Sequence, residues 1–314
     1  VLKKKSFLLA TDSFISQNIK EFKADSFSVF TGTEGPNRKF LIEYNKRGTP
    51  FAITKIGFSN SAKQIIKNEF NTLNYFNDFK FRLFEVPKVL KVGENYVTLT
   101  LCRPKQYKNA SDVTKLHINF FAEFYFHFSN KVLFDYKIIE ENIQSILKTY
   151  SKNKKLKSDQ ILLIGLKLSE LLNSIDQNKT LSLSFIHGDF TPWNMYLSKN
   201  KLFIYDWELS KQNYPLFYDL FHFVFQSEVL IHKADFNIIK KKIMALKNDR
   251  ILSEMIDKYG VDINLNFKIY LLDIISFYVN IYINQDLPHI QVYWLLNVWQ
   301  NALEDILKTE TLYL

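Results

Sequence analysis

The sequence predicts an α+β fold with two lobes, in which an N-terminal antiparallel sheet with one helix precedes a larger, mainly helical lobe. In the first third of the chain, short runs of β-branched and aromatic residues alternate with turn signals. After Arg103-Pro104, apolar residues recur mostly at helical spacing. We therefore expect an N-terminal lobe at 1–104 and a C-terminal lobe at 105–314, and 314 residues suffice for two hydrophobic cores.

The N-terminal lobe is predicted to begin with strands. The turn sequences GPN (35–37) and RGTP (47–50) separate three of them, at 26–33, 39–44 and 50–57. A helix is expected within SAKQIIKNEFNTLNYFND (61–78), with Ser61 as its N-cap. Two further strands, 88–93 and 95–102, lie on either side of Gly93-Glu94.

The C-terminal lobe is predicted to consist mostly of helices, interrupted by two polar motifs with short strands. The expected helices are 111–129, 137–149, 161–176, 216–231, 235–247, 264–284 and 289–307. The most apolar stretch, 269–283, contains Asp273 and Asn280 and is shorter than the roughly 20 residues that cross a bilayer. It therefore predicts a buried helix and no transmembrane segment.

Composition restricts the function classes. The chain has 41 Lys and Arg against 32 Asp and Glu, a net charge of +9, and its Lys-rich runs are typical of solvated faces. A basic field favours anionic ligands, but arginine- and glycine-rich RNA-binding signatures are missing, so a nucleic-acid partner is not expected. The single cysteine, Cys102, fits a reducing compartment. Polar residues soon interrupt the apolar start of the chain, so no signal peptide and a cytoplasmic location are expected.

Two motifs in the C-terminal lobe carry the functional signal. In HGDFTPWN (187–194) Asp189 precedes Asn194 by five positions, and in DWE (206–208) Asp206 follows the apolar strand LFIY. This is the spacing of a kinase catalytic loop, in which an Asp faces the acceptor hydroxyl and an Asn holds magnesium. Mg²⁺ prefers hard oxygen ligands, which a carboxylate and an amide supply. Packing of polar loops is the alternative explanation of these residues.

The N-terminal third contains residues that would complete such a site. Lys55 lies at the end of the strand PFAITKIG, and Glu69 lies fourteen residues later in the following helix. A lysine that binds phosphates needs a carboxylate to hold its flexible side chain. The hairpin FTGTEGPNRKF (30–40) is expected to cover the phosphates, and the backbone of Leu101, Cys102 and Arg103 to pair with adenine. The alternative is that Lys55 and Glu69 are ordinary surface residues.

The chain resembles the aminoglycoside phosphotransferase and choline kinase family of small-molecule kinases, which share the protein-kinase-like fold. The resemblance rests on HGDFTPWN and DWE, and in element order it extends over roughly residues 24–310. It implies ATP or GTP as donor, Mg²⁺, and a small hydroxylated acceptor. It also implies that Asp189 is the catalytic base or orients the hydroxyl, and that Asn194 and Asp206 bind the metal. Glu208 matches the Asp-x-Glu pattern of some relatives, which implies a ligand of metal or, alternatively, of substrate.

Other residues receive structural interpretations, and parts of the family pattern are missing. His187 is expected to position the loop backbone, and Asp219 to tie the next helix to the loop. The loop GTEG (32–35) lacks the full Gly-x-Gly-x-x-Gly signature of protein kinases, and DWE is not followed by an activation segment ending in Ala-Pro-Glu.

The predicted function is therefore transfer of the γ-phosphate of ATP to a hydroxyl of a small molecule, which could be a sugar, an amino alcohol or an aminoglycoside-like compound. The basic net charge favours a neutral or anionic sugar over a polycationic antibiotic. The two alternatives are a protein-kinase-like enzyme and a catalytically silent nucleotide-binding module. The sequence does not determine the oligomeric state.

Overall fold

The computed structural model describes residues 6–32, 37–101 and 103–308, and the side chains from Phe14 onward. The chain divides into two compact units. The first contains Val1–Tyr107 together with Phe203–Leu209, and the second contains Lys108–Leu202 together with Ser210–Leu314. The division predicted at 104/105 did not anticipate that a short later segment belongs with the N-terminal residues.

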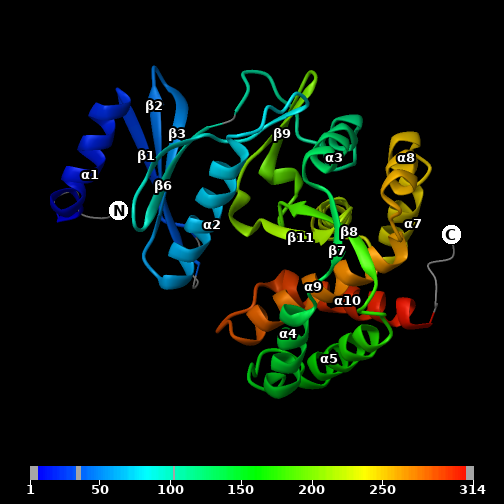
Figure 1. The fold of residues 1–314 in the computed structure, drawn as a ribbon. Helices are drawn as coiled ribbons and strands as arrows, with labels where there is room; N and C mark the ends of the chain where they lie inside the picture. The colour runs from blue at the N-terminus through cyan, green and yellow to red at the C-terminus, as the bar shows by residue number, and fades with distance from the viewer. Residues whose placement is uncertain (1–5, 33–36, 102, 309–314) are drawn as a thin grey trace. The chain divides into compact units, whose positions relative to one another are not determined.

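The first unit is built on an antiparallel sheet with the strand order β1-β2-β3-β6-β5 (Figure 1). These strands are β1 (Ser26–Phe30), β2 (Lys39–Lys46), β3 (Thr49–Gly57), β5 (Val89–Val92) and β6 (Tyr96–Thr100). A two-residue strand, β4 (Phe84–Glu85), precedes β5 in the chain and is not part of this sheet. The sequence-based prediction of the sheet is confirmed, with shifted ends.

One helix covers each face of this sheet (Figure 1). Alternate residues of β3 point to opposite faces. Ala52 lies in a buried cluster with Ile15 of α1 (Ser6–Phe22), a helix that the sequence analysis did not predict. On the other face, α2 (Asn60–Phe76) approaches β3 so closely that a Cβ added to Gly57 would lie 2.8 Å from the backbone of Ala62.

The N-cap of α2 differs from the predicted one. Ser59, not Ser61, caps the helix, and its side chain accepts a hydrogen bond from the backbone N–H of Ala62 at 3.0 Å. Both serines precede the apolar stripe, but only the residue at the true N-cap has the extended backbone that lets its oxygen reach back to the first turn.

The second unit combines helices with a three-stranded antiparallel sheet of order β11-β8-β7. Its strands are β7 (Asn130–Leu133), β8 (Thr180–Ile186) and β11 (Lys211–Pro215), and the chain also forms β9 (Met195–Ser198) and β10 (Lys201–Ile204) before entering the first unit. Short 3₁₀ turns, η1 (Pro192–Asn194) and η2 (Trp207–Leu209), occur in the two polar motifs.

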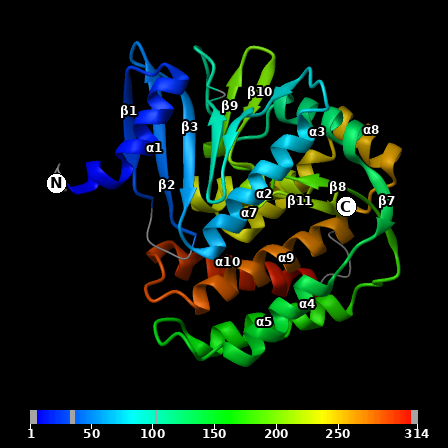
Figure 2. The same ribbon diagram turned by 60° about the vertical axis from the view of Figure 1, so that its left-hand side comes forward.

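The predicted helices of the second unit are present with altered bounds. They are α3 (Lys115–Phe128), α4 (Lys137–Thr149), α5 (Ser158–Asn173), α6 (Tyr218–Gln226), α7 (Phe236–Leu246), α9 (Ile263–Ile283) and α10 (Ile290–Lys308). A π-helical turn, η3 (Ser227–Ile231), continues α6, and α8 (Arg250–Tyr259) was not predicted. Helices α4, α5, α9 and α10 pack against one another (Figure 2).

Helix α9 is the buried helix that the apolar stretch predicted. Most of its residues, including Asp273, are buried, so it is surrounded by protein. Within the described residues, no helix has the length and apolarity needed to cross a membrane.

Candidate functional site

The first unit brings a lysine and three carboxylates together. Lys55 on β3 places its Nζ 2.7 Å from Glu69 Oε2 on α2 and 2.5 Å from Asp206 Oδ1 in the segment after β10. Glu208, two residues later, places Oε2 3.8 Å from the same ammonium. Lys55 and Glu69 are buried, so the alternative that they are ordinary surface residues is wrong.

The charges in this cluster shift one another's protonation. Burial alone would lower the pKa of Lys55, but the charges of Asp206 and Glu69 raise it above its ordinary value. Burial opposes ionisation of Asp206, yet Lys55 and Lys39 bring its pKa below the ordinary value. Burial and then the charge of Asp206 raise the pKa of Glu208 to about 7. Glu208 is therefore the carboxyl of this cluster that gains a proton most readily.

The backbone directs the two acidic side chains of this segment. Asp206 has a φ of 67°, in the left-handed region, which costs a residue other than glycine on the order of 1 kcal/mol or more. The 3₁₀ turn η2, which follows Asp206, is held by Asn68 of α2, whose Nδ2 donates to the backbone oxygen of Glu208 at 2.9 Å. Trp207 lies between the two acids in sequence and is fully buried, with its ring centroid 4.9 Å from that of Phe76.

The second unit builds the loop around Asp189. Strand β8 ends at Ile186, and Asp219 of α6 then accepts hydrogen bonds from the backbone N–H groups of His187 at 2.6 Å and Gly188 at 3.1 Å. Gly188 has a φ of 81°, a conformation that favours glycine. His187 Nδ1 accepts from the backbone N–H of Asp189 at 3.2 Å. His187 and Asp219 therefore hold the loop backbone, as the sequence analysis expected.

Two side chains hold the carboxylate of Asp189, which is 29% exposed. Asn194 Nδ2 donates to Asp189 Oδ2 at 2.8 Å and to its backbone oxygen at 3.0 Å. On the other side, Nε2 of the buried His222 lies 3.4 Å from Asp189 Oδ1. Both contacts use the amide nitrogen of Asn194, so its Oδ1 is not needed to hold Asp189.

The structure therefore groups the predicted site residues in two sets. Lys55, Glu69, Asp206 and Glu208 lie together in the first unit, and Asp189 and Asn194 lie together in the second. Of the predicted adenine-binding residues, the backbone N–H of Leu101 donates to Phe51 O at 2.9 Å, and the Arg103 guanidinium lies 4.9 Å from the ring centroid of Tyr107. Cys102 and residues 33–36 of the hairpin predicted to cover the phosphates lie outside the described residues. The adenine-binding role remains a prediction.

Sequence reasoning missed two residues of these sets. Lys39, at the start of β2, forms an ion pair with Glu208. His222 contacts Asp189 from α6, three residues after Asp219 and thus on the same helix face. The position of His222 after Asp219 was a usable signal, whereas Lys39 stands among many other lysines.

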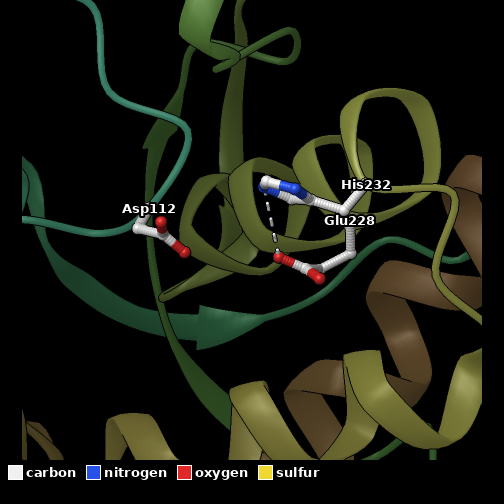
Figure 3. A group of neighbouring side chains, drawn as sticks. All are labelled: Asp112, Glu228 and His232. Carbon is white, nitrogen blue, oxygen red and sulfur yellow. Dashed lines mark ion pairs between the residues drawn. The ribbon is translucent and has the colours of Figure 1, made fainter.

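A second group of metal-ligand side chains lies in the second unit: Asp112, Glu228 and His232 (Figure 3). The ammonium of Lys242 lies 2.6 Å from Glu228 and 2.9 Å from Asp112, so a cation already links the two carboxylates. Asp112 is 68% exposed, and His232 is 4.0 Å from Glu228. This group is accounted for as an ion-pair network around the buried Glu228, with Lys242 as its cation.

Comparison with solved structures identifies the fold. The APH(2″)-IIa ternary complex with streptomycin and ATP has a TM-score of 0.57 at 12% identity, covering 96% of this chain and 97% of that chain. An apo thermostable mutant of aminoglycoside phosphotransferase APH(4)-Ia has 0.59 at 12%, covering 94% and 99%, and a microcompartment-associated aminopropanol kinase has 0.60 at 11%, covering 95% and 98%.

Sequence comparisons give no such match. No family model matches the chain, and no curated protein matches it. The structural likeness extends over nearly the whole chain in each of the three cases. The chain has the protein-kinase-like fold seen in these small-molecule phosphotransferases.

Proposed function

We propose that the protein transfers the γ-phosphate of ATP to a hydroxyl group of a small molecule. The observation that carries the proposal is the Lys55 ammonium held between Glu69 at 2.7 Å and Asp206 at 2.5 Å. A buried pair of this kind gives little net stability over apolar packing, because desolvation offsets the Coulomb attraction. A phosphate-binding lysine held by two carboxylates explains the arrangement better, and several solved proteins of the same fold are kinases in complex with nucleotides.

The proposed roles follow from the donors that each side chain offers. Lys55 donates to the nucleotide phosphates, and Glu69 holds its side chain. Asp189 accepts the proton of the attacking hydroxyl and aims that oxygen at the γ-phosphate, since its carboxylate is fixed by Asn194 and remains partly exposed. Proton acceptance and alignment together lower the barrier of the displacement.

The residues present fit a magnesium ion. Asp206 and Glu208 supply carboxylate oxygens and Asn194 an amide oxygen, the hard donors that Mg²⁺ prefers. When bound, the ion offsets the negative charge of the phosphates.

The acceptor is proposed to be a small hydroxylated compound. A sugar, an amino alcohol and an aminoglycoside-like compound remain the candidates, and the net charge of +9 favours a neutral or anionic sugar over a polycation. Solved proteins of the same fold include a glucosamine kinase and an aminopropanol kinase, which keeps amine-bearing acceptors in the test. A protein substrate is the second candidate, and a silent nucleotide-binding module is the third.

The test is transfer of radiolabelled γ-phosphate from Mg-ATP to a panel of hexoses, acidic sugars, choline, ethanolamine, aminopropanol, aminoglycosides and generic protein substrates. We expect one class of small acceptor to be labelled, and Asp189→Ala to reduce the rate about 100-fold or more. Asp286→Ala, at an exposed loop position, is the matched control and should keep the wild-type rate.

The outcomes separate the candidates. Labelling of protein substrates alone would favour the second candidate. If nothing is labelled, tight Mg-ATP binding would point to an acceptor outside the panel, and no binding would refute the proposal. An Asp189→Ala protein that retains the wild-type rate would refute the role of Asp189.

A further inference from the structure

Lys39 reaches the same carboxylates as Lys55 from the neighbouring strand. Lys39 begins β2 and is paired with Gly57 of β3, and its ammonium forms an ion pair with Glu208. The side chains of both partners are only 16% exposed. Glu208 Oε2 also lies 3.8 Å from Lys55, so one carboxylate stands between two lysines.

The local backbone holds Lys39 in place. A Cβ added to Gly32, whose φ is 65°, would lie 2.4 Å from the backbone oxygen of Lys39, so Gly32 lies directly against the start of β2. On the partner's side, Asn68 donates to the backbone of Glu208 at 2.9 Å. The backbone of each partner is therefore held within the first unit, Lys39 in β2 and Glu208 through α2.

Stability alone does not explain this pair. A single ion pair near the surface contributes roughly 0–1 kcal/mol, and partial burial adds a desolvation cost to both groups. A lysine ammonium, however, has three donors, so Lys39 can keep Glu208 and still donate to another anion. Because its partner Glu208 also lies 3.8 Å from Lys55, to which we assign phosphate binding, a phosphate oxygen is the fitting partner.

We propose that Lys39 is a second phosphate-binding cation of the nucleotide site, and that Glu208 holds its ammonium ready for the polyphosphate. The inference rests on the proposed function, because it assigns Lys39 to the site that contains Lys55 and Asp206. It adds that two lysines, from adjacent strands, share the charge of the nucleotide.

The test is calorimetric titration with a nonhydrolysable ATP analogue, ADP and adenosine, each with Mg²⁺ and with EDTA. We expect Lys39→Gln to weaken binding of the ATP analogue about tenfold, and this loss of affinity should persist in EDTA. Binding of ADP should weaken by the same factor or a smaller one, and binding of adenosine should not change. Lys39→Arg should restore most of the affinity. Lys46→Gln, at the exposed far end of β2, is the matched control and should bind like wild type.

A role through Glu208 alone is distinguished by a double-mutant comparison. If Lys39 only positions that carboxylate, Lys39→Gln will have no effect in a Glu208→Gln background. If Lys39 contacts phosphate, the loss for the ATP analogue will remain in that background. An unchanged affinity for the analogue, or an equal loss for adenosine, would overturn the proposal.

A second measurement uses the wild-type protein and does not depend on folding of the variants. Lysines are acylated with an amine-reactive reagent, and the modified positions are identified by mass spectrometry. We expect Mg-ATP, but not adenosine, to slow acylation of Lys39 while Lys46 is unaffected; equal rates at Lys39 would overturn the proposal. If the wild-type protein binds no nucleotide at all, the proposed function fails as well, whereas binding without protection of Lys39 refutes only the role of Lys39.

Discussion

Acidification is expected to destabilise the protein through His117, a histidine packed beside the loop that contains Asp189 and Asn194. Its ring is fully buried, Nδ1 accepts from the backbone N–H of Thr114 at 2.9 Å, and Nε2 lies 3.2 Å from Met195 Sδ. Met195 directly follows Asn194, and the ring of Phe190 lies 6.1 Å away, centroid to centroid. A protonated ring would turn the Nδ1 acceptor into a donor that faces another donor.

The magnitude follows from the pKa of His117. Burial lowers this pKa from 6.5 to about 4, so the folded state favours the neutral ring. The contribution to stability is fully present above pH 6.5 and is lost as the pH falls through 6.5 toward 4, because the unfolded state then binds more protons. The free energy of unfolding should decrease by ~2 kcal/mol at pH 5, and by ~3.4 kcal/mol in the limit well below pH 4.

Urea unfolding followed by circular dichroism between pH 7.5 and 4 measures this loss. His117→Gln is the informative variant, since glutamine at the third helical position retains the capping interaction with Thr114 but does not titrate. Between pH 7.5 and pH 5 the free energy of unfolding of this variant should decrease by about 2 kcal/mol less than that of wild type. His289→Gln, at an exposed position, should follow wild type. Parallel curves for wild type and His117→Gln would refute the reasoning.

Three further outcomes are expected. Asp206→Asn should weaken nucleotide binding about tenfold with Mg²⁺ and much less with EDTA, measured by calorimetry; an equal loss in both would argue against metal binding. Glu69→Gln should lower the free energy of unfolding in urea by about 2 kcal/mol, because a buried charged hydrogen bond to Lys55 is weakened; unchanged stability would contradict the structural role of the pair. His222→Leu should lower kcat about tenfold with little change in the KM for ATP, since Asp189 loses one of its two side-chain contacts; a change in KM alone would show that His222 does not act through Asp189.

The sequence predicted those parts of the site that depend on local spacing. Asp189 and Asn194 are five positions apart in one loop, and the structure places their side chains in contact, while their roles remain predictions. Lys55 and Glu69 are also in contact, because a strand and the helix that follows it pack together. These pairs follow from the order of neighbouring elements.

The remaining contacts depend on tertiary structure. Lys39 and Glu208 are 169 residues apart, and no periodicity relates the two positions. The N-cap of α2 was placed at Ser61 instead of Ser59 because helix ends are uncertain by one or two residues in sequence. Helix α1 was not predicted although Ile15 and Ile19 have helical spacing, because the polar residues 11–13 interrupt the apolar pattern of that segment.

The division of the chain has a consequence for synthesis on the ribosome. The N-terminal unit ends its first portion at Tyr107, but it is completed only by Phe203–Leu209, almost a hundred residues later. Until that segment emerges, Phe76 lacks the indole of Trp207 and the buried ammonium of Lys55 lacks the carboxylate of Asp206. During synthesis the ammonium of Lys55 therefore has Glu69 as its partner first, and completion of the first unit follows translation of the whole loop that contains Asp189.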